Sequence, residues 1–271
     1  MSRALVLGGG GPVGVGWQAG LLAGLLEAGL ALRNADVVIG TSAGSVVGAQ
    51  LTSGHSLADV VAPIGTAPPW ASSTSDAPPM DLAELLASGP VATVSEEEFA
   101  ARFDFLRGVE WPENFRCTSF GSTSGRFAVW DRAAGVELRR AVASSCSVPG
   151  LSPAITIGDE RYIDGGARDM LNADLAVGHD RVVALSCVVL EPPAGLVPDL
   201  LAARLPDVRT RIGELQSTGS EVEVVEPSDE VRDLSGWGAY LMDFARTAAA
   251  FDAGVRQSKE EARRLEPFSS G

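Results

Sequence analysis

The feature that most constrains this chain is a serine placed between two glycines at the end of a short apolar run. Residues 37–45 read Val-Val-Ile-Gly-Thr-Ser-Ala-Gly-Ser, so a β-branched segment typical of a strand runs directly into a G-x-S-x-G pattern. This pattern is typical of a sharp turn that lifts a serine nucleophile off a strand and starts a helix. Ser42 is therefore the candidate nucleophile, and Gly40 and Gly44 give the turn its backbone freedom. A serine that only caps the next helix is the structural alternative.

A glycine-rich loop near the start of the chain forms a second part of the candidate site. Residues 4–7 predict a short apolar strand, residues 8–14 read Gly-Gly-Gly-Gly-Pro-Val-Gly, and residues 17–26 predict a buried helix that stops near Gly29. A strand, a glycine loop and a buried helix are a usual opening of an α/β sheet. Because loops after parallel strands emerge at the same carboxyl edge, this loop is expected beside Ser42.

Three kinds of ligand site are compatible with the glycine loop. Gly9, Gly11 and Gly14 match the G-x-G-x-x-G pattern of dinucleotide sites. Such a site also needs an acidic residue at the end of the second strand, whereas Asp36 lies at its start. A P-loop lacks its Lys-Ser or Lys-Thr. We favour an oxyanion hole, in which glycine N–H groups at a helix N-terminus face a developing negative charge, over a purely structural turn.

The charge balance and the cysteines exclude several classes of partner. The 271 residues include 21 Lys and Arg against 35 Asp and Glu, which gives a formal net charge of −14. This charge disfavours binding to nucleic acid and binding to anionic lipid through a polybasic segment. No apolar run approaches the ~20 residues of a spanning helix, so any membrane contact is expected to be peripheral. Three scattered cysteines, Cys117, Cys146 and Cys187, predict neither a disulfide framework nor a metal site and fit a cytoplasmic protein.

Residues 65–112 form a long excursion between the predicted second and third strands. Its first part is rich in Pro, Ser and Ala, and helices are predicted over residues 81–87 and 96–106. The second helix starts with Ser95 and Glu98 at capping-box spacing. Its apolar face is most simply core, but long excursions in compact domains are often functional, so we also expect a lid or acyl-pocket wall here.

The rest of the chain predicts further strands and helices. The expected strands are 115–120 and 126–130, a hairpin of 155–157 and 161–163, a central strand 181–190 and an edge strand 221–225. The expected helices are 136–145, 170–177 and 235–251, the last within a mostly helical C-terminal portion, 191–271. The hairpin delivers Asp164, a carboxylate at a strand end followed by two glycines.

A serine hydroxyl needs a neighbouring base, and the chain offers few. His55 follows the helix after Ser42, which carries it away from the turn. His179 comes after Asp164 in the Ser, Asp, His order of an α/β-hydrolase, but it precedes a strand and so belongs at the opposite edge of the sheet. Asp164 is therefore the better candidate base, acting directly on Ser42.

Three motifs together resemble the patatin-like phospholipase family. Residues 9–14 (G-G-G-P-V-G), 40–44 (G-T-S-A-G) and 164–166 (D-G-G) have the order and spacing of the family pattern G-G-G-x-[KR]-G, G-x-S-x-G and D-G-[GA]. The resemblance implies a three-layer α/β/α fold with a mostly parallel central sheet and a Ser42–Asp164 dyad. It also implies hydrolysis of acyl esters of lipids, in lipid degradation, without metal or cofactor.

One departure from the family pattern affects the expected site. The family has Lys or Arg before the last glycine of the loop, where this chain has Val13 after Pro12. Proline has no N–H to donate, so Gly10 and Gly11 are the expected oxyanion donors. Without that cation, a neutral lipid or simple ester is as suitable a substrate as a phospholipid.

The sequence thus predicts a single patatin-like acyl hydrolase domain over residues 1–271, a serine esterase acting on lipid or fatty-acyl esters. Its alternatives are an α/β-hydrolase-like triad that uses His179, and a lipid-binding regulator without turnover. The expected supporting motif residues are Gly9, Gly14, Gly40, Gly44, Gly165 and Gly166.

Overall fold

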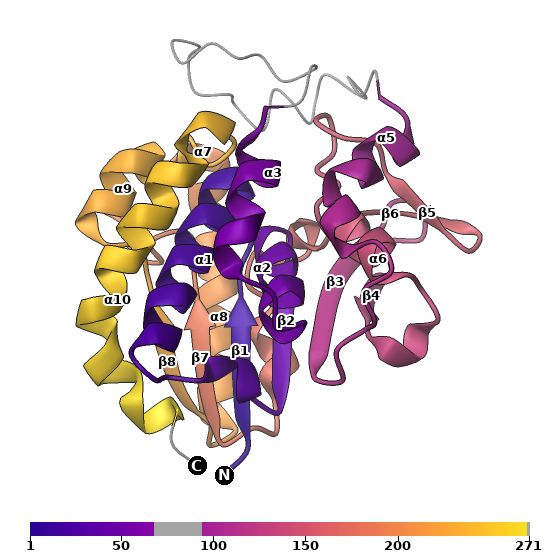
Figure 1. Ribbon diagram of the computed structural model, residues 1–271. Helices are drawn as coiled ribbons and strands as arrows, with labels where there is room; N and C mark the ends of the chain where they lie inside the picture. The colour runs from indigo at the N-terminus through magenta and orange to yellow at the C-terminus, as the bar shows by residue number, and fades with distance from the viewer. Residues whose placement is uncertain (68–93, 270–271) are drawn as a thin grey trace.

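The computed structural model describes residues 1–67 and 94–269, and these form a single central sheet of eight strands (Figure 1). The spatial order is β5-β6-β3-β2-β1-β7-β8, and β4 pairs with β3 outside this path. The strands are β1 (Arg3–Leu7), β2 (Val37–Thr41), β3 (Phe115–Gly121), β4 (Phe127–Trp130), β5 (Ile155–Ile157), β6 (Glu160–Asp164), β7 (Arg181–Leu185) and β8 (Glu221–Val225).

The sheet is mostly parallel, as predicted. Strands β8, β7, β1, β2 and β3 run in the same direction, whereas β4, β5 and β6 are joined by antiparallel pairings. The α-helices are α1 (Gly11–Glu27), α2 (Ala43–Thr52), α3 (Val61–Gly65), α5 (Glu96–Ala100), α6 (Leu138–Ser145), α7 (Asp199–Ala202), α8 (Leu205–Ser217), α9 (Asp229–Ser235) and α10 (Thr247–Ser269).

Both faces of the sheet are covered by helices, which gives the three layers. Along β1 the side chains alternate: Leu5 and Leu7 join the core beneath α1, α2 and α10, whereas Ala4 and Val6 join a second core beneath α8 (Figure 1). A strand that is buried on both faces consists of consecutive apolar residues, which explains the apolar sequence of β1. The predicted fold class is confirmed.

Helices α1 and α10 pack side by side on one face of the sheet, and glycines allow the two helices to touch (Figure 1). A Cβ added at Gly16 would overlap the main-chain oxygen of Thr247, and one added at Gly20 would overlap that of Phe251. The contact is reciprocal, because a Cβ at Gly254 of α10 would overlap the carbonyl of Trp17. Main-chain contacts with α10 along its length therefore fix the position of the helix that follows the glycine loop.

Several predicted elements differ from the structure. Strand β7 ends at Leu185 and lies next to the edge strand β8, so it is not central. The predicted helix 170–177 is only a 3₁₀ turn, η6 (Ala173–Ala176), because Asn172 before it adopts a positive φ of 55°. The predicted helix 235–251 is also wrong: Gly236, Trp237 and Gly238 all have positive φ, and α10 begins only at Thr247.

The excursion is described only in part. Residues 68–93, including the predicted helix 81–87, lie outside the described residues. The predicted helix 96–106 consists of α5 and a 3₁₀ helix, η3 (Ala101–Leu106), with a kink at Phe103. The capping box of Ser95 and Glu98 is confirmed. Within residues 1–67 and 94–269, none of the helices has the length and apolar character required to cross a bilayer.

Candidate active site

Ser42 occupies a strained turn between β2 and α2. Its backbone has φ 52° and ψ −116°, a region that non-glycine residues rarely adopt and that costs on the order of 1–3 kcal/mol. The flanking glycines are required by close contacts, since a Cβ at Gly40 would lie 2.5 Å from the oxygen of Gly44, and one at Gly44 would overlap the oxygen of Leu7. The strand, turn and helix predicted around Ser42 are therefore confirmed.

Hydrogen bonds hold both main-chain polar groups of Ser42. Its N–H donates to the hydroxyl oxygen of Ser145, the last residue of α6, at 2.9 Å. Its carbonyl accepts from the hydroxyl of Ser45 at 2.6 Å and from the thiol of Cys146 at 3.3 Å. These bonds stabilise the strained turn from the two helices that meet there.

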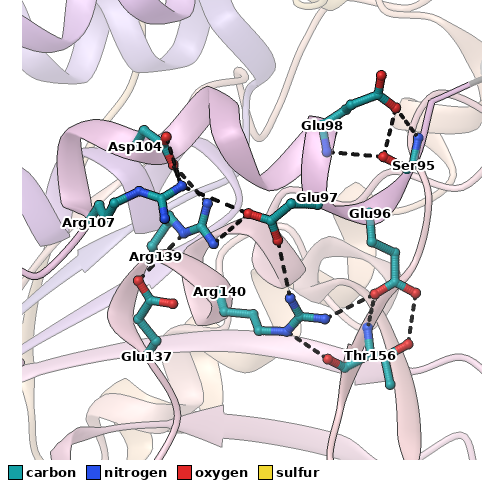
Figure 2. A network of polar contacts seen from close by, with 10 residues as sticks. All are labelled: Ser95, Glu96, Glu97, Glu98, Asp104, Arg107, Glu137, Arg139, Arg140 and Thr156. Atoms are coloured by element: carbon teal, nitrogen blue, oxygen red, sulfur yellow. Dashed lines mark hydrogen bonds and ion pairs between the residues drawn. The ribbon is translucent and has the colours of Figure 1, made fainter.

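Helix α6 is itself fixed by a network of ion pairs and hydrogen bonds (Figure 2). The buried guanidinium of Arg139 donates to Asp104 at 2.7 Å and to Glu97 at 3.0 Å. Arg140 donates to Glu96 at 3.1 Å. The described end of the excursion, α5 and η3, is thus attached to the helix whose last residue contacts the serine turn.

The pairing of the strands brings Asp164 towards Ser42. Thr41 at the end of β2 is level with Thr118 on β3, and the next residue of β3, Ser119, is level with Asp164 at the end of β6. Ser42 follows Thr41, so the two candidate catalytic residues flank the same position of β3. Strand β3 continues past the end of β2, and β6 returns antiparallel beside it.

Asp164 is buried, with 5% of its surface exposed, and its environment suits a general base. Burial raises the pKa of Asp164 to about 6, and the Ser42 hydroxyl, the Gly166 N–H and the Arg204 charge oppose this rise. Its Oδ1 atom accepts the Gly166 N–H at 2.7 Å. Its Oδ2 atom is buried and has no hydrogen-bond partner of ordinary geometry in the described ranges.

The Ser42 hydroxyl is near enough to lower the pKa of Asp164, but it forms no aligned hydrogen bond to Oδ2. Catalytic hydrogen bonds are often long or poorly aligned before substrate binds and tighten afterwards. At neutral pH a carboxyl group of this pKa is mostly ionised, so Oδ2 is available to accept a proton.

The glycine loop lies against the serine turn. A Cβ added at Gly9 would be 3.4 Å from the Cβ of Ser42, and the N–H of Gly44 donates to the oxygen of Gly8 at 3.1 Å. Gly14 also lies in this packing, because a Cβ there would be 3.4 Å from the Cβ of Ala43 and 2.9 Å from the sulfur of Cys187. The glycine loop and the Ser42 turn are therefore adjacent, as the sequence predicted.

Two N–H groups of the loop are available for an anion. Gly9 and Val13 already donate to main-chain carbonyls elsewhere in the chain, at 2.7 and 3.2 Å, and Pro12 has no N–H. Gly10 and Gly11, at the N-terminus of α1, donate to no acceptor within residues 1–67 and 94–269. The positive end of the helix dipole favours negative charge at this place.

Buried polar side chains and two glycines pack behind the Ser42 turn. Asn172 donates through Nδ2 to the hydroxyl of Thr41 at 3.0 Å, and that hydroxyl lies 2.9 Å from the hydroxyl of Thr118. Gly165 must lack a side chain, because a Cβ there would overlap Thr118. At Gly166 a Cβ would lie 2.9 Å from Asp164 Oδ1.

Neither histidine lies at this site. His179 precedes β7 at the amino edge of the sheet, where its Nδ1 atom is 3.0 Å from the oxygen of Ala176. His55 is exposed after the end of α2. Asp36 also lies at the amino edge, where it accepts the Arg3 N–H, so it cannot serve a nucleotide in the glycine loop.

The described residues contain no group of three or more His, Cys, Asp or Glu side chains that could hold a metal ion.

Three contributions to the site were not expected from the sequence. Ser145 contacts Ser42 from 103 residues away, and Arg204 contacts the turn after Asp164. The segment at Leu241 and Met242 covers the glycine loop: a Cβ at Gly11 would be 2.5 Å from the Leu241 oxygen and 2.7 Å from the Met242 sulfur. No local pattern marks these contacts, because each joins segments that are distant in the chain.

Comparison with known proteins identifies one family and several solved structures of low sequence identity. The family described as Patatin-like phospholipase matches residues 5–177. VipD from Legionella pneumophila is 12% identical in sequence, with a TM-score of 0.46, over 97% of this chain and 67% of that chain. The type III effector protein ExoU is 15% identical, with a TM-score of 0.38, over 95% of this chain and 53% of that chain. The chain thus spans about half the length of the second of these structures. No curated protein matches it.

Proposed function

Because the chain belongs to the patatin-like phospholipase family, whose members are lipid hydrolases, we propose that it is a serine acyl hydrolase that uses Ser42 and Asp164 as a catalytic dyad. The observation that supports the proposal is the buried Oδ2 atom of Asp164, which has no hydrogen-bond partner in the described ranges. The nearby Ser42 hydroxyl lowers the pKa of this carboxyl group. An acceptor left open beside a strained serine is what a general base requires.

In the first half-reaction, Asp164 takes the hydroxyl proton of Ser42 while the serine oxygen attacks the ester carbonyl. The negative charge of the tetrahedral intermediate develops next to the free N–H groups of Gly10 and Gly11, which donate to it. The carbonyl re-forms, the bond to the alcohol oxygen breaks, and Asp164 returns its proton to that oxygen. The products are the free alcohol and an acyl-Ser42 ester.

In the second half-reaction, Asp164 takes a proton from water, and the hydroxide attacks the acyl-Ser42 carbonyl. The same two N–H groups stabilise the second tetrahedral intermediate. Its collapse releases the carboxylic acid, and the proton on Asp164 returns to the Ser42 oxygen. No redox step or added cofactor enters this balance.

The substrate class follows from what surrounds the glycine loop. Val13, which stands where the family has a cation, is buried in the core and donates its N–H to Leu241. The loop therefore offers no positive side chain to a phosphate. We propose that this loop binds the ester group through its N–H groups and does not itself bind a phosphate headgroup.

The direct test is a series of p-nitrophenyl esters of increasing acyl length, combined with fluorophosphonate labelling and peptide mapping. We expect hydrolysis by the native protein, label on Ser42, and loss of both in Ser42→Ala. Ser122→Ala, which changes an exposed serine of the β3–β4 turn, is the matched control and keeps both activities. Label on another serine, or full turnover by Ser42→Ala, would refute the proposal.

A further inference from the structure

Arg204 contacts the turn that carries the candidate base, although it lies in the C-terminal portion of the chain. It precedes α8 and is outside residues 5–177, the range matched by the family. Its Nη1 atom donates to the carbonyl of Gly166 at 2.9 Å and to that of Ala167 at 3.1 Å. Both carbonyls belong to the short turn that directly follows Asp164.

This contact fixes the group that holds the Asp164 carboxylate. The N–H of Gly166 donates to Asp164 Oδ1 at 2.7 Å, and the carbonyl of the same residue accepts from Arg204. Gly166 is therefore held on both sides, with the carboxylate on one and the guanidinium on the other. Movement of the guanidinium would be transmitted to the carboxylate through a single residue.

Arg204 differs from the arginines near it in having no paired carboxylate. Arg168 forms an ion pair with Asp174, and Arg211 forms one with Asp169. Arg204 forms no ion pair with an acidic side chain in the part of the chain that the structure describes. Its positive charge consequently acts on the buried Asp164 and favours the ionised form of that group.

The other groups that face Asp164 carry no charge. From β2 and α2 comes the hydroxyl of Ser42, and from the turn itself the Gly166 N–H. From the end of α6 comes the thiol of Cys146, whose pKa is raised well above its usual range by burial, so it remains neutral. Within the described ranges, Arg204 is thus the charged group that acts on this carboxylate.

We propose that Arg204 is a positioning residue that holds the turn after Asp164 through its bonds to the Gly166 and Ala167 carbonyls and places a positive charge beside the buried carboxylate, so that the C-terminal portion of the chain sets the working pH of the base. This inference rests on the proposed Ser42–Asp164 dyad. It assigns a role in the reaction to a residue outside the range that the family matches.

The first test is the pH dependence of kcat/KM for a p-nitrophenyl ester. The native enzyme should lose activity below about pH 6, where Asp164 becomes protonated. Removing the positive charge in Arg204→Gln, or in Arg204→Met as a second charge-free variant, should move the midpoint of this loss up by roughly 0.5–1 pH unit. Arg204→Lys, which keeps the charge, should return the midpoint towards the native value.

Arg209→Gln is the matched control. Arg209 is a partly buried arginine of α8, the helix that Arg204 precedes. Its guanidinium also donates to a main-chain carbonyl, that of Leu190, but it is not among the groups that shift the pKa of Asp164. Its loss removes the same charge from the protein and should leave the midpoint unchanged. Equal midpoints in native enzyme, Arg204→Gln and Arg209→Gln would overturn the inference.

A second readout does not depend on turnover. In protein labelled with ¹³C at the aspartate carboxyl groups, the Asp164 resonance is identified by its absence from Asp164→Asn and is then titrated. The midpoint should be higher in Arg204→Gln than in the native protein. If the midpoint rises but the native protein hydrolyses no ester, the proposed function fails and the coupling stands. An unchanged midpoint overturns the coupling whatever the activity.

Discussion

The main-chain N–H of Ser42 donates to the side-chain oxygen of Ser145 at 2.9 Å, although 103 residues separate the two. The bond satisfies a buried donor in a backbone conformation that is costly for a serine. It also links the serine turn to α6, whose other end is held by the acidic residues of α5 and η3 (Figure 2). The geometry of the candidate nucleophile thus depends on a helix from a different part of the chain.

We therefore expect Ser145→Ala to lower both stability and activity. The substitution leaves the Ser42 N–H buried without an acceptor, which should cost about 1–3 kcal/mol in the free energy of unfolding. It should also lower kcat for ester hydrolysis, because the turn can relax. Urea unfolding and steady-state kinetics measure the two effects.

The control for this experiment is Ser144→Ala. Ser144 is equally buried in the same helix, but its hydroxyl donates to a carbonyl of α6 itself, that of Ala141. We expect its activity to remain within about twofold of native. Similar kinetics for the two variants would show that the contact with Ser42 does not matter for turnover.

Asp164→Asn should remove activity and at the same time stabilise the protein at neutral pH. Because the folded-state pKa of about 6 lies above the value of the unfolded chain, the folded protein holds this proton more tightly. The group stabilises the fold at low pH, and this contribution is lost as pH rises through about 6. Replacing it by a neutral amide should raise the free energy of unfolding by up to roughly 2–3 kcal/mol at pH 7.5.

The measurement is denaturant unfolding of both proteins at pH 4 and pH 7.5. We expect the gain from Asp164→Asn at pH 7.5 to be much smaller at pH 4, where the native carboxyl group is protonated as well. A gain of the same size at both pH values would show that the charge of Asp164 is not the cause.

His179→Ala separates the dyad from a triad. The ring lies at the amino edge of the sheet, next to Ala176 and away from the serine turn. We expect kcat/KM to stay within about twofold of native, whereas loss of the general base in a triad typically costs on the order of 10⁴-fold or more. A crippled His179→Ala enzyme with normal thermal stability would restore the α/β-hydrolase-like alternative.

Gly20→Ala should be strongly destabilising even though it adds only one methyl group to a helix. A Cβ at this position overlaps the main-chain oxygen of Phe251, so α1 and α10 would have to separate. Overpacking of this kind costs roughly 1–3 kcal/mol or more. Thermal unfolding followed by circular dichroism gives the comparison.

The matched control is Gly213→Ala in α8, where a Cβ would meet nothing within 4 Å. At that exposed helical position alanine should stabilise by about 0.5–1 kcal/mol, because it has the higher helix propensity. Equal effects of the two substitutions would show that the main-chain contact between α1 and α10 is not essential.

The parts of the site that could be predicted from the sequence are those with local causes. The turn at Ser42 follows from two glycines beside a strand, and the hairpin before Asp164 follows from two short apolar runs around a turn. The prediction of a helix over 235–251 was wrong because Gly236, Trp237 and Gly238 adopt positive φ. The two glycines are a local signal against a helix, but the spacing of the apolar residues favoured one. The roles of Ser145 and Arg204 depend on distant segments meeting, so no window of the sequence contains them.

The close fit of α1 and α10 bears on how the protein can be shortened. The stretch matched by the family ends at residue 177, yet the helix that carries the glycine loop is covered along one side by residues 247–269. Cutting the gene after the matched stretch would remove β7, β8 and α10, and would leave the side of α1 that carries Gly16 and Gly20 open to water. A shortened form of the protein therefore has to retain its last helix to keep α1 covered.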